Sequence, residues 1–212
     1  MDSDFILIAI IALGLVGLIV LFVWMKSRGR RQVVKAITAV QEALKLTLFV
    51  GTNTQLDSVW IAVRGQVAGT TIRIFGGRGS GGAVATPLDR AFVLVVVTMP
   101  TIIPFRCMVQ RRLAMSAPRF GTSYEEFDKN IEVKTDNEKK ALTLLNSEEL
   151  RNAIVSFIKS TSNAFITSSE IVCKVSGDRQ ILLVANEALN IASLIVSQIK
   201  KLSEEKPPQK PI

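Results

Sequence analysis

The chain has 212 residues, 26 basic and 18 acidic side chains, a net charge of +8 and no histidine. The absence of histidine excludes His-based triads, His-based acid–base catalysis and most zinc chemistry. A basic balance suits either nucleic acid or an anionic membrane surface. With one tyrosine and two tryptophans, the chain has no aromatic platform interleaved with basic residues, which disfavours nucleic acid.

An uninterrupted apolar run from Phe5 to Met25 dominates the start of the chain. As a helix, about 21 residues rising 1.5 Å each cover about 31 Å, the thickness of the hydrocarbon core of a bilayer. Residues 1–4 are short and acidic, and the run ends at Lys26 without a small-x-small cleavage pattern, which disfavours a removable signal peptide. We therefore predict a retained transmembrane helix at residues 5–25.

Basic residues follow this run and none precedes it; they are Lys26, Arg28, Arg30, Arg31 and Lys35. Because basic residues close to a span are retained in the cytoplasm, the pattern predicts a single-pass protein of the inner membrane with its N-terminus outside and its C-terminal domain in the cytoplasm. The same five residues are candidate contacts for anionic lipid headgroups, each contributing about 1 kcal/mol near the surface.

Residues 26–50 combine this basic collar with an amphipathic helical pattern. Apolar side chains recur at three-to-four spacing, at Val33, Ile37, Val40, Leu44 and Leu48. Three interpretations fit this pattern: a helix packed on its own domain, a stalk that pairs with a second copy, and a helix lying in the membrane interface. The stripe is too short to predict a coiled coil.

Residues 51–203 are expected to form an α+β domain with a mainly antiparallel or mixed sheet of about five or six strands and packed helices. Alternating apolar residues predict strands before and after a turn at Gly69-Thr70, the second of which ends at residue 75. The β-branched run 91–99 predicts a central strand covered on both faces. The glycine-rich segment 76–82 matches neither phosphate-binding fingerprint, and we interpret it as a loop between strands, with a phosphate or headgroup contact through Arg78 as the alternative.

The segment 105–112 alternates in the manner of a strand. Its basic residues Arg106, Arg111 and Arg112 are candidate contacts for anionic lipid or an acidic partner, with a solvated strand face as the alternative. The two cysteines, Cys107 and Cys173, belong to no motif and are expected to be buried, reduced thiols.

The remaining pattern alternates short strands with helices. A solvated turn is expected at 124–128, then a strand at 130–134. Helices are expected after a Thr135-x-x-Glu138 capping box and again after Ser147. A single strand over 165–175 and a long buried helix ending near Leu202 follow, and residues 204–212 are a Pro-rich flexible tail. The predicted apolar stripe of the long helix is Ile181, Val184, Ala188, Ile191, Ile195 and Ile199.

Three segments stand in an order that resembles a group of uncharacterised bacterial single-pass membrane-anchored proteins. They are Gly65–Gly69, the pair Phe127-Asp128 leading into Ile131 and Val133, and Ser147–Ile158. The resemblance implies a cytoplasmic α+β domain on a membrane stem and no established activity.

These patterns favour a membrane-tethered, non-catalytic interaction or scaffold protein acting at the inner membrane surface. The expected partners are the lipid bilayer, anionic headgroups, a second copy of the chain or another membrane protein. One alternative is a membrane-anchored enzyme with a site of carboxylate, Ser and Lys groups, which the sequence does not locate. The other is a subunit of an envelope secretion system, which the charge bias disfavours. No catalytic, cofactor or metal-binding residue is predicted.

Overall fold

The computed structural model describes residues 3–56, 58–79, 91–112, 120–161, 163–176 and 180–204. Five helices and eight strands lie in these ranges. The strands form one sheet in the order β1-β2-β3-β4-β8-β7-β5-β6, and each of these neighbouring pairs is antiparallel. The α+β class and the antiparallel sheet agree with the prediction, whereas the expected count of about five or six strands is too low.

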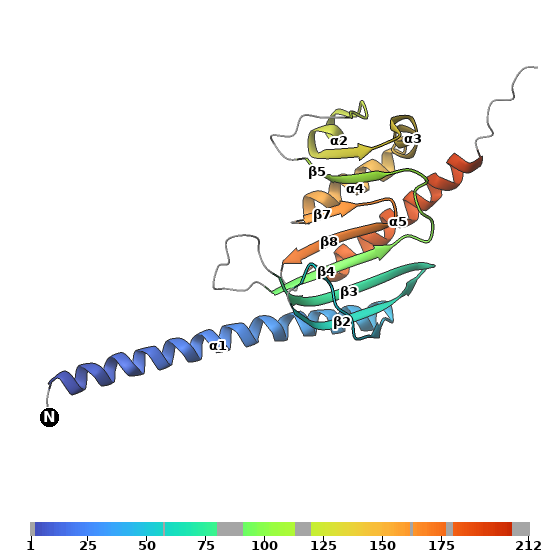
Figure 1. Ribbon diagram of the computed structural model, residues 1–212. Helices are drawn as coiled ribbons and strands as arrows, with labels where there is room; N and C mark the ends of the chain where they lie inside the picture. Colours follow the sequence, from blue (N-terminus) through green and yellow to red (C-terminus); the bar gives the residue numbers. More distant parts are fainter. Residues whose placement is uncertain are drawn as a thin grey trace, which may run out of the picture.

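Helix α1 runs without a break from Ser3 to Leu44, and its first half protrudes from the domain (Figure 1). The side chains of residues 3–14, 19, 22, 25 and 26 lie outside the described part of the chain. From Gly29 onward the helix lies on the sheet, since a Cβ at this position would be 3.8 Å from the Cβ of Ala91. Of the predicted stripe, Val33, Ile37 and Val40 are buried in the main core. Leu48 is instead exposed, on the two-residue strand β1 (Thr47–Leu48).

Strands β2 (Ser58–Val67), β3 (Thr70–Arg78) and β4 (Ala91–Thr98) form a meander beside α1. The β2–β3 turn is Ala68-Gly69, one residue earlier than predicted, and both residues have positive φ (49° and 80°), as a tight hairpin requires.

The interpretation of the glycine-rich segment as a loop is wrong for its first residues, because Gly76 and Gly77 lie inside β3. A Cβ at Gly76 would lie 2.5 Å from the Ile37 side chain and 2.6 Å from that of Val33. Glycine is needed there because α1 packs directly onto the strand. Residues 80–82 lie outside the described part of the chain.

The middle of the chain contains β5 (Cys107–Arg111), α2 (Glu125–Asn130), β6 (Ile131–Thr135), α3 (Glu138–Leu144) and α4 (Glu148–Ser160). The expected turn at 124–128 is largely the helix α2. The expected capping box is absent, because Asn137 caps α3 by accepting the N–H of Lys140 at 3.0 Å. Ser147 caps α4 as predicted, and accepts the N–H of Leu150 at 3.3 Å.

The predicted strand over 165–175 is a hairpin of two strands, β7 (Asn163–Ile166) and β8 (Glu170–Ser176). The Thr167 hydroxyl accepts the N–H groups of Ser169 and Glu170 at 3.3 and 3.0 Å, which fixes a turn inside an otherwise strand-like run. This hairpin and the short strand β1 account for the additional strands.

Helix α5 (Ile181–Glu204) carries the predicted stripe, and all six of its positions are buried. It packs on α1, α3, α4, β4 and β8. Among the described residues, α5 is the one helix long and apolar enough, by length and composition, to cross a membrane. It lies at the C-terminal end, whereas the predicted span is N-terminal and most of that run's side chains fall outside the described part. The buried stripe of α5 is the arrangement of a core helix.

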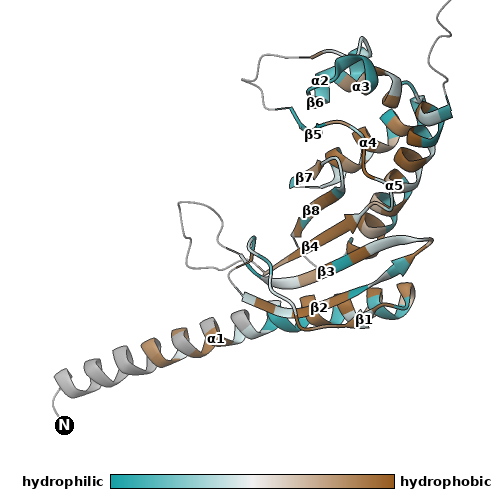
Figure 2. Cartoon of the chain, turned by 45° about the vertical axis from the view of Figure 1, so that its right-hand side comes forward, coloured by the Kyte–Doolittle hydropathy of each residue, from teal (hydrophilic) through white to brown (hydrophobic). Residues whose placement is uncertain are grey.

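The described helices cover one face of the sheet. Val93, Val95 and Val97 of β4 point into this main core. The other face carries a second apolar cluster beneath the segment around Phe49 and Leu56, formed by Leu56, Ala62, Phe75, Leu94, Val96 and Val172. Figure 2 shows the resulting concentration of hydrophobic residues on β4 and β8. The central strand is thus buried on both faces, as predicted, although a loop segment rather than a helix covers the second.

The strands run roughly along the packed half of α1. Gly29 lies at Ala91, which begins β4, and Leu46 lies at Gly65, which pairs with Ile72. One end of the sheet therefore faces the protruding half of α1, and we call it the α1 end. It consists of the amino ends of β2, β4, β6 and β7 and the carboxyl ends of β3, β5 and β8.

Candidate functional site

The protruding half of α1 exposes apolar side chains on all sides of the helix. Their exposed fractions are 55% for Leu15, 59% for Val16, 65% for Leu18, 61% for Val20, 50% for Leu21, 59% for Val23 and 50% for Trp24. Monomeric soluble proteins rarely expose a continuous apolar surface of this kind. A helix that is apolar all around is normally buried in protein or in lipid.

Basic side chains begin where this apolar surface ends. Arg28, Arg31 and Lys35 are exposed and, at spacings of three and four residues, share the helix face that points away from the sheet. The Arg28 guanidinium lies 5.2 Å from the centroid of the Trp24 ring, within the range of a cation–π contact. Arg30 is exposed on the flank, and Lys26 lies outside the residues whose side chains are described.

The Arg31 guanidinium is held by the helix itself. Its Nη2 donates to the Ser27 hydroxyl at 3.2 Å, and that hydroxyl donates to the Trp24 carbonyl at 2.9 Å. The tryptophan and the arginines thus form one continuous strip, which we call the Trp24–Lys35 strip. It presents an aromatic ring at the apolar boundary and positive charge beyond it.

Arg111 and Arg112, at the α1 end of the sheet, have structural partners. Arg111 Nη2 donates to the carbonyls of Ile158 and Lys159 at 2.9 and 3.3 Å, at the carboxyl end of α4. Arg112 Nη1 donates to the Asp128 carbonyl of α2 at 2.8 Å. These guanidiniums satisfy carbonyls that have no partner within their own helix and oppose the negative end of the helix dipole.

Arg106 lies at the opposite end of the sheet from the α1 end. It precedes β5, its side chain is exposed and its backbone N–H donates to Asp136 Oδ1 at 3.0 Å. The structure thus brings Arg28, Arg30, Arg31 and Lys35 together on one helix, and it separates this group from the arginines of the β5 segment.

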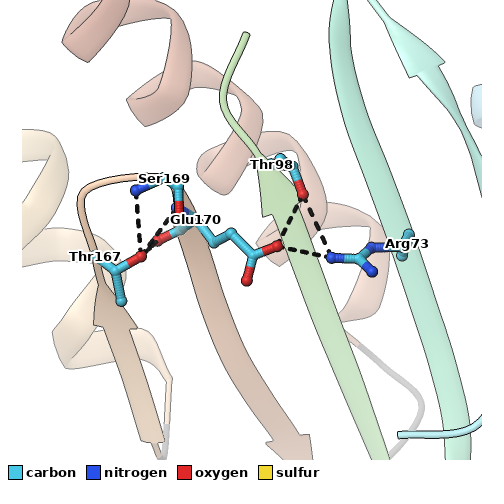
Figure 3. A network of polar contacts seen from close by, with 5 residues as sticks. All are labelled: Arg73, Thr98, Thr167, Ser169 and Glu170. Atoms are coloured by element: carbon cyan, nitrogen blue, oxygen red, sulfur yellow. Dashed lines mark hydrogen bonds and ion pairs between the residues drawn. The ribbon is translucent and has the colours of Figure 1, made fainter. Parts of the chain in front are cut away.

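A polar network that the sequence did not predict crosses three strands on the sheet face without helices (Figure 3). Arg73 Nη2 lies 2.7 Å from Glu170 Oε1, and the Thr98 hydroxyl donates to the same carboxylate oxygen at 3.1 Å. The side chains of Arg73 and Glu170 are 39% and 33% exposed, so the pair is worth about 1 kcal/mol or less. The network thus makes a small contribution to stability by connecting β3, β4 and β8 through their side chains. Alternation alone places Arg73 on this face, but nothing in the sequence pairs it with a residue 97 positions away.

Two surface hollows contain polar side chains that could take part in catalysis. One of about 520 Å³ lies at the sheet end opposite the α1 end, lined in part by Arg106, Lys134 and Ser168. The Ser168 hydroxyl donates to the Phe105 carbonyl at 2.9 Å and accepts the Cys107 N–H at 3.0 Å. It thus connects the turn between β7 and β8 to the start of β5. The other, of about 480 Å³, lies between α2 and α4. There Lys159 pairs with Glu126 at 3.5 Å.

The two thiols are buried and unpaired with each other, as predicted. Burial, with a smaller effect of Asp136, raises the pKa of Cys107 to about 11. Burial, with a smaller effect of Glu187, raises the pKa of Cys173 to about 12. Because the thiolate is the reactive form, both cysteines are unreactive at neutral pH. The described residues contain no group of three His, Cys, Asp or Glu side chains that could hold a metal ion.

Comparison with known proteins gives no family model and no curated protein that matches the chain. Among solved structures, the chain is similar to the mycobacterial trehalose monomycolate transport factor A at 11% sequence identity and a TM-score of 0.46. The alignment covers 86% of this chain and 98% of that one.

Proposed function

We propose that the protein is a membrane-tethered, non-catalytic interaction or scaffold protein, anchored by residues 5–25 and displaying its α+β domain at the cytoplasmic surface of the inner membrane. The observation that carries this proposal is the continuity of α1. One unbroken helix exposes apolar side chains in its first half and packs into the domain core with its second half. A span joined to the domain in this way has no flexible linker, so it fixes the height of the domain above the membrane.

The basic residues of α1 support the proposed topology. Their position directly after the apolar run favours retention of the domain in the cytoplasm. Trp24 at the apolar boundary suits the aromatic belt of a membrane interface. We assign the anionic-lipid contact to these α1 residues, since Arg111 and Arg112 already bind helix carbonyls and Arg106 lies at the far end of the sheet.

The scaffold role, rather than catalysis, is favoured by how the described polar side chains are used. The Ser168 hydroxyl, the Arg111 and Arg112 guanidiniums and the Arg73–Glu170 pair all connect elements of the fold to one another.

Two reporters fused after residue 212 of the full chain test the anchor and its direction. The expected result is alkali-resistant membrane association, with activity from a reporter that works only in the cytoplasm and none from a reporter that works only after export. Replacing Lys26, Arg28, Arg30 and Arg31 by Gln should reduce the cytoplasmic fraction, whereas Arg106→Gln should not. Export of the wild-type fusion, or its release by alkali, would refute the proposed anchor or topology.

The scaffold role is tested by purifying the full chain in mild detergent. We expect a stoichiometric complex with a membrane protein or with a second copy. A homogeneous monomer without a co-purifying protein would contradict the scaffold role while leaving the membrane anchor intact.

A further inference from the structure

The distance between the end of the predicted span and the domain is short. A Cβ at Gly29 would lie 3.8 Å from the Cβ of Ala91 at the α1 end of the sheet. Gly29 follows Met25 by four residues, a helical rise of about 6 Å. The polar layer of each leaflet is about 5–8 Å thick, from the difference between the full bilayer and its hydrocarbon core. If Met25 marks the end of the span, the α1 end of the sheet therefore lies at the outer edge of the headgroup layer.

The first turn of α5 carries two exposed leucines, and it follows the strand end at Ser176 by only a few residues. Strand β8 ends at the α1 end with Ser176, and α5 begins five residues later at Ile181. Ile181 is buried, whereas Leu182 and Leu183 are 39% and 55% exposed. The helix then packs on α1 and β4 and ends on the side of the domain away from the protruding half of α1 (Figure 1).

We propose that the first turn of α5 is a second membrane contact, in which Leu182 and Leu183 enter the headgroup layer of the leaflet that receives Trp24. This inference rests on the proposed membrane anchor. A lipid surface is the occupant we assign because the unbroken α1 helix brings this turn to the membrane without any further partner. With the span and the α5 turn both in contact, the domain is held at two points and cannot rotate freely about the axis of α1.

Single cysteines on one face of α5 test the contact in the full chain reconstituted into phospholipid vesicles. Leu183, Asn190 and Ser197 are exposed and follow one another at seven-residue spacing, so their labels move away along the helix in steps of about 10 Å. Each position is changed to Cys and labelled with an environment-sensitive fluorophore. Quenching by nitroxide-labelled lipids is then measured. Cys107 and Cys173 are buried with raised pKa values, so they stay unlabelled at neutral pH.

Quenching by headgroup nitroxides is expected to be strong at Leu183→Cys, weaker at Asn190→Cys and absent at Ser197→Cys. Ile102→Cys is the matched control, because Ile102 is 65% exposed and lies beyond the far end of β4. Quenching at position 183 no greater than at position 102 would overturn the second contact, including the case in which another protein covers the leucines.

Val20→Cys separates this inference from the anchor on which it rests. Val20 is 61% exposed within the apolar half of α1, and its label should be quenched by nitroxides placed deep in the acyl chains. Deep quenching at position 20 without headgroup quenching at position 183 refutes the α5 contact alone. Absence of quenching at position 20 refutes the membrane anchor and the α5 contact together.

Discussion

The two halves of the continuous helix α1 differ in how their apolar side chains are distributed and buried. In the half packed on the sheet, Val33, Ile37 and Val40 are 0–3% exposed, while Arg31 and Lys35 occupy the opposite face. In the protruding half, apolar residues occupy every face, and the described ones are 50–65% exposed. The first arrangement is that of a helix between protein and water. The second is normally found in helices that are buried in protein or in lipid.

The change from one arrangement to the other takes place within about one and a half helical turns. Four residues, 25–28, separate Trp24, the last residue of the exposed apolar run whose side chain is described, from Gly29, where a Cβ would lie 3.8 Å from the Cβ of Ala91. No glycine or proline breaks the helix between them. The continuous helix therefore fixes the direction of the protruding half relative to the domain. Because only the packed half contacts the core, the same kind of substitution should change domain stability differently in the two halves.

Truncating a buried residue of the packed half should give the largest effect. Ile37→Ala removes a fully buried side chain between α1 and β3, and should lower the free energy of unfolding by about 3 kcal/mol. Denaturation of the full chain in mild detergent, followed by circular dichroism, measures the loss. Leu18→Ala in the protruding half is the matched control, and should change the stability of the domain by less than about 0.5 kcal/mol because Leu18 is 65% exposed. Equal losses would show that the protruding half also belongs to the domain core.

Adding volume where α1 meets β3 should have the next largest effect. Gly76→Val places carbons where the Ile37 and Val33 side chains now lie, and should cost about 2 kcal/mol through overpacking. Gly17→Val is the control, since a Cβ at Gly17 meets no atom within 4 Å. The combination of Gly76→Val with Ile37→Ala should be less damaging than the sum of the two, because the smaller side chain makes room for the valine. Strict additivity would mean that α1 does not rest on Gly76.

The spacing of apolar residues was sufficient to predict the buried residues of elements that bury a single face. The stripe of α5 from Ile181 to Ile199 is buried as predicted, because its regular apolar period gives the helix one face that can be buried against the sheet. The central position of β4 was likewise predictable from its β-branched run.

The errors arose where contacts between distant segments decide the local structure. Gly76 and Gly77 suggest a loop, yet both belong to β3. The space of the missing side chain at Gly76 is taken by α1, some forty residues earlier in the chain, and that at Gly77 by the backbone of Ser58. The turn at Thr167 has no glycine or proline, and it forms because a hydroxyl replaces the missing strand partners. The roles of Arg111 and Arg112 depend on helix ends that the sequence could not place beside them.

The smallest expected effects distinguish the arginines on α1 from those that cap helices. Arg111→Ala leaves the carbonyls of Ile158 and Lys159 without their donor, and should lower domain stability by about 1 kcal/mol. Arg28→Ala should leave domain stability within about 0.5 kcal/mol of wild type, because its described contact is with Trp24 in the protruding half.

For the binding of anionic lipid, we expect the larger effect from Arg28→Ala and the smaller one from Arg111→Ala. Loss of one surface cation weakens the attraction of an anionic headgroup by about 1 kcal/mol, or about fivefold in affinity. Anionic phospholipid that co-purifies with the full chain in mild detergent, measured by mass spectrometry, should therefore fall for Arg28→Ala and stay unchanged for Arg111→Ala. If Arg111→Ala lost its lipid while Arg28→Ala kept it, the headgroup contact would belong to the α1 end of the sheet. The basic residues of the Trp24–Lys35 strip would then act only in setting the membrane topology.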